Sequence, residues 1–349
     1  MRIGTGGMGA VRKAEFKNAS LIFVATLIWG TAFVAQSLGS SHLGAFSFTA
    51  FRNLIGFLFL IPVAVLFQAR GISARPMEED RPDNIFIPGR RGQRAFVTKT
   101  ELACGSVLGL IVFIASNVQQ LGIAGTTTAK AGFFTAMYVI FVPILSIFLG
   151  KRAKKMIWLC VALSIVGLYM LSMKGGRVSL NLSDGLELLS GLCFAVHIMY
   201  VGYRSPRCDG VVFAMIQFAV SSALSLIFAL ILEHPGIEDI GLAIFPLLYA
   251  GILSSGVAFT LQIIGQKNLN PTLASILMCF ESVISAVAGW IFLHQRLSAL
   301  EMMGCAVLFA AILLATLFGG TEEGPAEMAD PAASRKYVRI RETDKELVG

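Results

Sequence analysis

The chain has 349 residues, of which 56% are hydrophobic and only 14% are charged, and its formal net charge is +7. Soluble domains carry about 25% charged residues, so this composition excludes an ordinary soluble protein. The basic residues lie in segments between long apolar runs, which is typical of membrane topology, and we therefore expect no nucleic-acid partner.

Ten apolar runs are each long enough to cross a bilayer as a helix. No Asp, Glu, Lys or Arg separates Lys17 from Arg52, or Glu101 from Lys130. Because the runs are continuously apolar and do not alternate, they predict helices and not the strands of a barrel. In chain order, the predicted spans are residues 20–37, 46–67, 102–122, 127–150, 156–173, 185–203, 211–232, 240–264, 272–293 and 302–318.

The positive charges predict how these spans are oriented. With a cytoplasmic N-terminus, the inside segments hold 23 of the 28 Lys and Arg residues, and the outside segments hold three. Cytoplasmic loops are the ones that retain Lys and Arg. We therefore expect a multi-pass protein of the cytoplasmic (inner or plasma) membrane. The tails 1–18 and 320–349 and the loop 70–99 are expected to lie in the cytoplasm.

The second half of the chain repeats the first. Residues 150–152 align with 294–296 at an offset of 144, and an offset of 165 pairs Trp29 with Phe194 and Arg52 with Gln217. Five spans are thus followed by five similar ones, and because five is odd, the second copy enters the membrane from the opposite side. The predicted fold is an all-α integral membrane protein of ten transmembrane helices, arranged as two inverted five-helix repeats in residues 19–175 and 176–319.

Four segments carry a resemblance to a known family. They read LIWGTAFV at 27–34, FRN at 51–53, AGFFTAMYVIFVP at 131–143, and LASIL followed by FES at 273–282. They resemble motifs of the EamA-type ten-helix members of the drug/metabolite transporter (DMT) superfamily. The sequence departs from the family where Ser282 stands in place of a frequent Pro, and where Lys151 and Gln295 replace frequent Glu residues. The resemblance implies secondary or facilitated transport of amino acids, metabolites or drugs, often outward.

Two charged residues inside the spans are the first candidates for a binding site. Glu281 lies near the middle of the ninth span, where a charge costs about 2.5–3.5 kcal/mol unless it faces protein or water. It is expected to bind substrate or a proton, or to form a hydrogen bond between helices as a neutral acid. Arg52 is expected to bind a substrate carboxylate or to pair with Glu281; the alternatives are snorkelling and a tie to helix-end carbonyls.

Other polar groups in the spans complete the predicted substrate site. His197 is a candidate proton relay, or a neutral imidazole bonded to a neighbouring helix. Trp29, Asn117 and Tyr138 are expected to line a cavity or to join helices. Two further charged residues, Lys130 and Glu187, lie one turn inside their spans and are expected to snorkel to the surface.

These features predict a secondary transporter that moves a small metabolite, either amino-acid-like or drug-like, outward by alternating access. Its expected partners are that solute, the lipid bilayer and candidate coupling protons, while the oligomeric state stays open. The sequence contains no Walker A, H-E-x-x-H or G-x-S-x-G motif and no C-x-x-C pair, so we expect no enzyme activity, cofactor or metal. A membrane-embedded enzyme and a channel are the alternatives.

Overall fold

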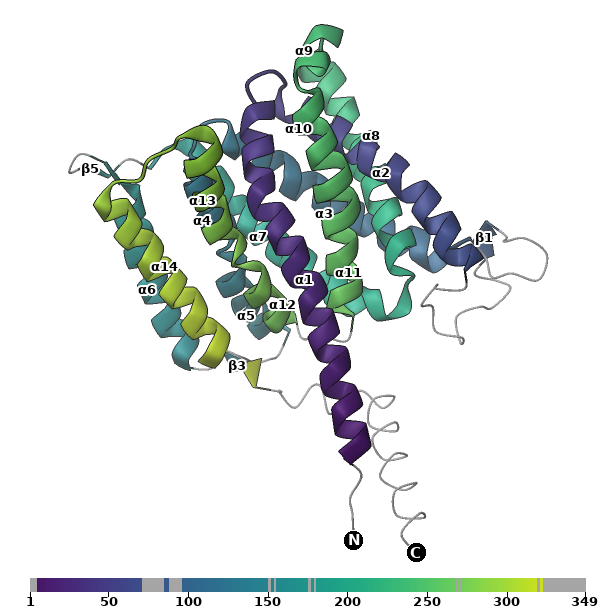
Figure 1. Ribbon diagram of the computed structural model, residues 1–349, viewed down its shortest axis with the longest axis horizontal. Coiled ribbons are helices and arrows are strands. Elements are labelled where there is room, and N and C mark those ends of the chain that lie inside the picture. The colour runs from purple at the N-terminus through teal and green to yellow at the C-terminus, as the bar shows by residue number, and fades with distance from the viewer. Residues whose placement is uncertain are drawn as a thin grey trace, which may run out of the picture.

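The computed structural model describes residues 5–70, 85–87, 96–149, 152–153, 155–174, 177–178, 180–267, 269, 271–318 and 321–322. Almost all of these residues are helical (Figure 1). Most of the predicted loop 70–99, residues 1–4 of the predicted N-terminal tail, and most of the predicted tail 320–349 lie outside the described residues.

Among the described residues, the first half of the chain forms six α-helices and the second half forms eight. The first six are α1 (Thr5–Gly39), α2 (Ala45–Ala69), α3 (Lys99–Ile123), α4 (Thr128–Thr135), α5 (Tyr138–Phe148) and α6 (Lys155–Ser172). The others are α7 (Leu182–Arg204), α8 (Gly210–Leu232), α9 (Ile237–Leu242), α10 (Ile244–Leu248), α11 (Phe259–Gln266), α12 (Pro271–Met278), α13 (Glu281–Leu293) and α14 (Ala299–Phe318). A 3-10 turn (Ser205–Arg207) follows α7, and a π-helical segment (Tyr249–Ala258) joins α10 to α11.

The described part of the chain also contains three very short antiparallel strand pairs, which the sequence did not predict. They are β1 (Ile85–Ile87) with β2 (Val97–Thr98), β3 (Arg152–Ala153) with β6 (Thr321–Glu322), and β4 (Met173–Lys174) with β5 (Arg177–Val178). The β3–β6 pair brings the chain after α5 next to the chain after α14.

Seven helical stretches of the described chain are long and apolar enough to cross a membrane. They are Phe16–Gly39, Ala45–Ala69, Lys99–Ile123, Thr128–Phe148, Leu182–Arg207, Gly210–Leu232 and Ile244–Gln266. Three shorter apolar stretches lie at Trp158–Gly167, Glu281–Leu293 and Ala299–Ala311. Every predicted span therefore coincides with a helix or with an interrupted helix. At the N-terminus, α1 already begins at Thr5, within the segment predicted as a tail.

Two of the predicted spans are interrupted at equivalent places. The first breaks at Ala136 and Met137, between α4 and α5, and the second breaks at Cys279 and Phe280, between α12 and α13. At both breaks the backbone forms a tighter turn, in which an N–H group donates to the carbonyl three residues earlier. Val139 N–H donates to the Ala136 carbonyl, and Ser282 N–H donates to the Cys279 carbonyl, each at 3.1 Å. α4 packs against α13, and α5 packs against α12.

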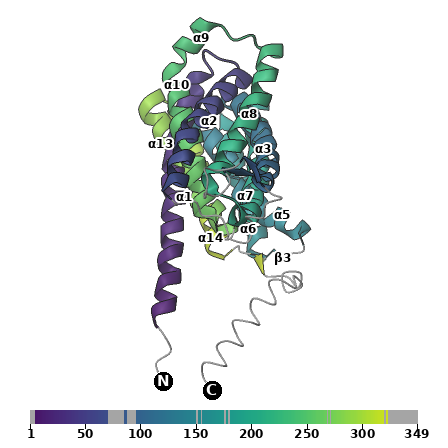
Figure 2. The ribbon, with the colours of Figure 1, turned by 90° about the vertical axis from the view of Figure 1, so that its right-hand side faces the viewer.

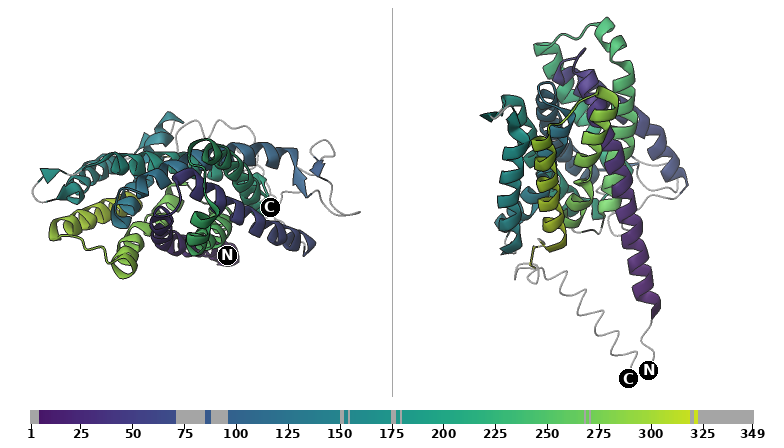
Figure 3. Two further views of the ribbon diagram at one scale, coloured as in Figure 1. Left: turned by 90° about the horizontal axis from the view of Figure 1, so that it is seen from above. Right: turned by 60° about the vertical axis from the view of Figure 1, so that its left-hand side comes forward.

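The helices form an elongated slab when seen from above (Figure 3). α6 and α14 lie side by side at one end of the slab, while α2 packs against α8 and α3 packs against both α7 and α8. Near the middle, the π-helical segment approaches α2 closely. A methyl group on Gly251 would lie 2.9 Å from the carbonyl oxygen of Arg52, so only glycine permits this contact.

Candidate functional site

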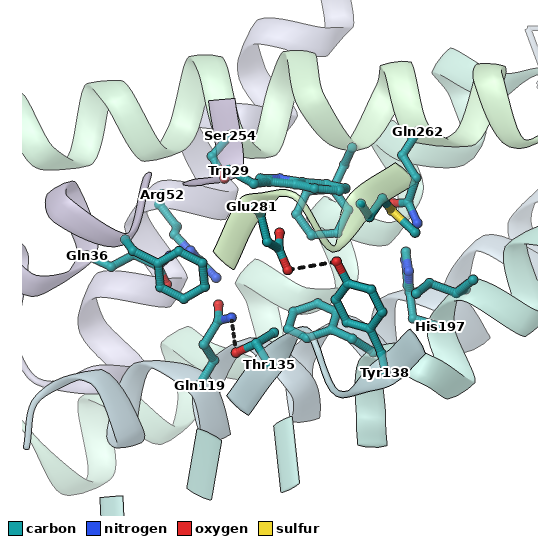
Figure 4. A pocket seen from close by; sticks show the side chains of 15 residues that line it. Trp29, Gln36, Arg52, Gln119, Thr135, Tyr138, His197, Ser254, Gln262 and Glu281 are labelled. Atoms are coloured by element: carbon teal, nitrogen blue, oxygen red, sulfur yellow. Dashed lines mark hydrogen bonds between the residues drawn. The ribbon is translucent and has the colours of Figure 1, made fainter. Parts of the chain in front are cut away.

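A cavity opens between the interrupted helices and is lined by side chains from most of the helices (Figure 4). The side chains around it leave about 500 Å³ of empty space, which includes space open to the solvent. The lining residues are Trp29, Phe33, Gln36, Arg52, Gln119, Thr135, Tyr138, Phe194, His197, Ile198, Ser254, Phe259, Gln262, Met278 and Glu281. Five of the six predicted site residues are therefore brought together at one cavity.

Glu281 and Tyr138 meet across the cavity. The Tyr138 hydroxyl donates a hydrogen bond of 2.9 Å to Oε1 of Glu281, whose side chain is 5% exposed (Figure 4). Each residue is the first of its half-helix, because Tyr138 opens α5 and Glu281 opens α13. Glu281 thus lies directly after the break between α12 and α13.

Arg52 brings a second buried charge to the cavity from α2. Its side chain is 3% exposed, and its Nε atom has no hydrogen-bond partner among the described residues. No described acidic side chain forms an ion pair with it. The ion pair with Glu281, which the sequence suggested as one alternative, is therefore absent. A buried guanidinium without an anion is costly, and the cavity next to it is therefore suited to a negatively charged group.

Aromatic rings and an imidazole form the walls on the other side. The ring of Trp29 packs edge-on against Phe259 with centroids 4.8 Å apart, and its indole nitrogen has no partner among the described residues. His197 lines the cavity and also lies 3.2 Å, through Nε2, from Oε1 of Gln217 on α8. Its ring contacts Phe259 edge-on as well, with centroids 5.6 Å apart.

Several polar lining residues were not assigned to the site from the sequence. Gln119 donates a 3.4 Å hydrogen bond to Thr135, and Gln36 and Gln262 each keep a buried oxygen that has no partner in the described chain. A glutamine inside an apolar span is the only sequence signal that these residues carry. The apolar lining residues Phe194, Phe259 and Met278 carry none.

Asn117 is the predicted site residue that does not line this cavity. Its amide nitrogen donates to the Phe113 carbonyl at 2.7 Å and to the Ser225 hydroxyl at 2.8 Å, which ties α3 to α8. Asn117 and Gln119 are two residues apart, so they point about 200° apart around the helix axis and only one of them can face the cavity. Joining helices was the alternative considered for this residue.

Lys130 and Glu187, the two charged residues that were expected to snorkel, both have partners within the protein. The ammonium group of Lys130 forms an ion pair with Asp184 at 3.4 Å, and Asp184 also accepts a 2.6 Å hydrogen bond from Thr126. Glu187 is completely buried and accepts a hydrogen bond from Thr135. The snorkelling prediction is therefore wrong for Glu187. In the part of the chain that the structure describes, no group of three His, Cys, Asp or Glu residues is arranged to hold a metal ion.

Comparison with known proteins finds several transporters. A transporter of Archaeoglobus fulgidus is 25% identical over 313 residues, which cover 89% of each chain. The transporter YoaV of Bacillus subtilis is 23% identical over 310 residues, covering 84% of this chain and 95% of YoaV. The threonine/homoserine exporter RhtA of Escherichia coli K12 is 30% identical over 180 residues, covering 49% of this chain and 58% of RhtA.

The fold itself has been seen in a crystal structure, which aligns with a TM-score of 0.59 at 20% identity over 86% of this chain and 96% of the other. The profile of the EamA-like transporter family matches the sequence twice, at residues 17–173 and 182–317. These two matches cover most of the chain, and they agree with the apolar helices of a multi-pass membrane protein. The chain therefore belongs to the EamA-like transporter family.

Proposed function

We propose that the protein is a secondary transporter that exports a small, amino-acid-like solute across the cytoplasmic membrane by alternating access. The observation that carries this proposal is the placement of two opposite charges on one cavity. Arg52 and Glu281 are both buried, both line the cavity, and do not pair with each other. A zwitterion would satisfy both, with its carboxylate at Arg52 and its ammonium group at Glu281.

The surrounding groups fit the same class of solute. The aromatic side chains of the lining offer apolar surface to a short side chain and π-electrons to an ammonium group; they are Trp29, Tyr138, Phe194 and Phe259. A purely hydrophobic cation would leave Arg52 buried without an anion, which disfavours the drug-like alternative. The relative RhtA is named a threonine/homoserine exporter, and this name supports an amino-acid-like solute and the outward direction.

We infer that ten transmembrane helices form two inverted halves, residues 19–175 and 176–319. The three shorter apolar helices, added to the seven long ones, make up this number. The family profile matches each half once, and the two interrupted helices break at equivalent positions. Helices that are equivalent in the two halves also pack against each other, as in α2 with α8 and α6 with α14. Inverted halves favour rocking around a site near the midplane.

The arrangement of the ends supports cytoplasmic termini. The start of α1 lies at the same end of the molecule as β3, whereas β5 and α9 lie at the opposite end (Figures 1 and 2). β3 lies within the Lys- and Arg-rich segment 151–155, and this supports a cytoplasmic location for that end. The cavity would then be reached from the cytoplasm in one state and from outside in the other.

The test is transport by the purified full chain in sealed vesicles, with radiolabelled threonine as the first probe and glycerol as a neutral control. We expect saturable threonine flux, inhibition by unlabelled amino acids, and accelerated counterflow when the opposite side is loaded. A panel of zwitterionic amino acids that all fail to move or compete would reject the substrate class. A membrane-embedded enzyme would alter its substrate in detergent, and a channel would show no counterflow.

A further inference from the structure

Glu187 is a buried carboxylate of α7 that the proposed substrate cavity does not include. Its exposure is 0%, and its Oε2 accepts a 3.0 Å hydrogen bond from the Thr135 hydroxyl on α4. Its Oε1 is buried and has no hydrogen-bond partner in the described chain. On α3, Gly122 lies against it, because a methyl group there would come within 2.9 Å of Oε1. This pocket holds the neutral acid much better than the anion.

One hydroxyl group separates Glu187 from the cavity. Thr135 donates to Glu187 and accepts a 3.4 Å hydrogen bond from Gln119, and both Thr135 and Gln119 line the cavity (Figure 4). Neither residue carries a charge. A change in the charge of Glu187 would therefore be felt through Thr135 at the cavity wall.

The nearby charged groups leave Glu187 without a counterion. Asp184 lies three residues earlier on α7, about 4.5 Å along the axis, and forms the 3.4 Å ion pair with Lys130 of α4. Across the cavity, Glu281 of α13 accepts a hydrogen bond from Tyr138 of α5. The residue of α3 next to Glu187 is the uncharged Gly122. α11 and α12 contact the C-terminal half of α7, away from Glu187. The Lys130 charge is thus directed to Asp184.

The position of Glu187 couples its charge to the fit between the two halves. Glu187 belongs to the second half, whereas Gly122 and Thr135, which enclose it, belong to the first. The contact lies near the end of the molecule where α4 and α7 begin, which is the proposed outer end. If the halves separate here, water reaches the carboxyl group and its charged form becomes stable.

We propose that Glu187 is a proton-binding site, distinct from the substrate cavity, and that the outer end of the interface closes only when this site is occupied. Closure takes one proton from the outer water and places it on a Glu187 oxygen, turning the carboxylate into a neutral acid. Reopening returns that proton to the outer water. The inference rests on the proposed alternating access of the two halves, but it does not depend on the identity of the solute.

The protonation state can be measured directly, without any solute. We would record pH-difference infrared spectra of the full chain in lipid vesicles and follow the C=O stretch of neutral carboxylic acids. Glu187→Gln keeps the size of the side chain and should lose one such band, whereas the matched variant Glu281→Gln should retain it. Thr135→Val keeps the acid but removes its hydrogen bond, and should move the same band to higher frequency. An unchanged spectrum in Glu187→Gln, or an unmoved band in Thr135→Val, would overturn the proposal.

Closure is measured by hydrogen exchange of the peptides that contain α4 and the start of α7. Comparing variants at each pH removes the intrinsic pH dependence of exchange. At alkaline pH, wild type should exchange several-fold faster than Glu187→Gln, because only wild type carries a charge at this position. At acidic pH the two proteins should exchange at the same rate, because the side chain is neutral in both. Equal exchange of the two proteins at alkaline pH would refute the link between proton binding and closure. If wild type carries no threonine at all, the proposed solute is rejected, but the hydrogen-exchange comparison still tests the link between proton binding and closure.

Discussion

At the scale of single residues, the two buried charges of the cavity are held in different ways. Glu281 receives a hydrogen bond from Tyr138, so part of its charge is balanced within the protein. Arg52 has no acidic partner among the described residues. The guanidinium should therefore depend more strongly on the solute than the carboxyl group does.

We predict that Arg52→Ala lowers threonine flux more than Arg52→Lys does if the side chain mainly supplies charge. A hydrogen bond to a charged group contributes about 1.5–3 kcal/mol, which corresponds to roughly a 10- to 150-fold loss of affinity in the Ala variant. Equal and severe losses in both variants would indicate planar, bidentate binding of the carboxylate. Normal flux by Arg52→Ala at a normal protein level would remove Arg52 from the site. The measurement is concentration-dependent counterflow in vesicles.

For Glu281, we predict that Glu281→Gln weakens binding of zwitterionic and cationic solutes and leaves a neutral analogue nearly unaffected. The amide can still accept the hydrogen bond of Tyr138, so stability should change little, whereas Glu281→Ala should lose roughly 0.6–2 kcal/mol of it. Measuring transport with and without an imposed pH gradient separates two roles of Glu281, namely binding of the solute and coupling of transport to protons. An unchanged half-saturation concentration and full gradient dependence in the Gln variant would leave only a structural role.

The charges of the site were predictable from the sequence, but the shape of the cavity was not. Arg52 and Glu281 are visible as charges within apolar spans. The choice between Asn117 and Gln119 depends on the rotation of α3 about its axis, which a uniformly apolar run does not specify. Glu187 was misjudged because one turn from a span end is close enough for snorkelling, and only the packing of Gly122 and Thr135 shows that it is enclosed.

At the scale of helices, each span predicted from hydropathy coincides with a helix or an interrupted helix of the described chain, but hydropathy missed the two interruptions. The breaks at Ala136–Met137 and at Cys279–Phe280 contain neither glycine nor proline, so the sequence carries no local signal for them. They lie where the two interrupted helices pack together, with α4 against α13 and α5 against α12. Likewise, the π-helical segment next to α2 reflects tertiary contact, which a single-sequence pattern does not contain.

The close contact of this segment with α2 gives a prediction at the same scale. A methyl group on Gly251 would meet Ile55 and the carbonyl of Arg52, so Gly251→Ala should force the two helices apart at a cost of about 1–3 kcal/mol. Because the contact involves the backbone of Arg52, flux should fall together with thermal stability in detergent. Gly185→Ala is the matched control, since a methyl group at that exposed position meets no atom within 4 Å. Equal melting of the two variants would contradict the close packing.

At the scale of the whole molecule, the two halves match the same family profile but bring different chemistry to the cavity. The first half supplies Arg52 and Tyr138 to the cavity, and the second supplies Glu281 and His197. Tyr138 and Glu281 each lie directly after a break, as the first residues of α5 and α13. A solute bound in the cavity between the two halves would therefore meet different groups on its two sides, and each half would contribute one of the two charges.

The inverted arrangement makes a prediction about topology that tests the whole span count. A reporter that is active only in the cytoplasm should be active when fused after Gly349, because ten spans return the chain to the side of the N-terminus. The same reporter fused to a chain truncated after Pro235, between α8 and α9, should be inactive, since seven spans precede it. A reporter that is active only outside the cytoplasm should give the opposite pattern at both sites. One missed or surplus helix inverts every later segment, so an extracytoplasmic C-terminus would overturn both the number of spans and the inverted halves.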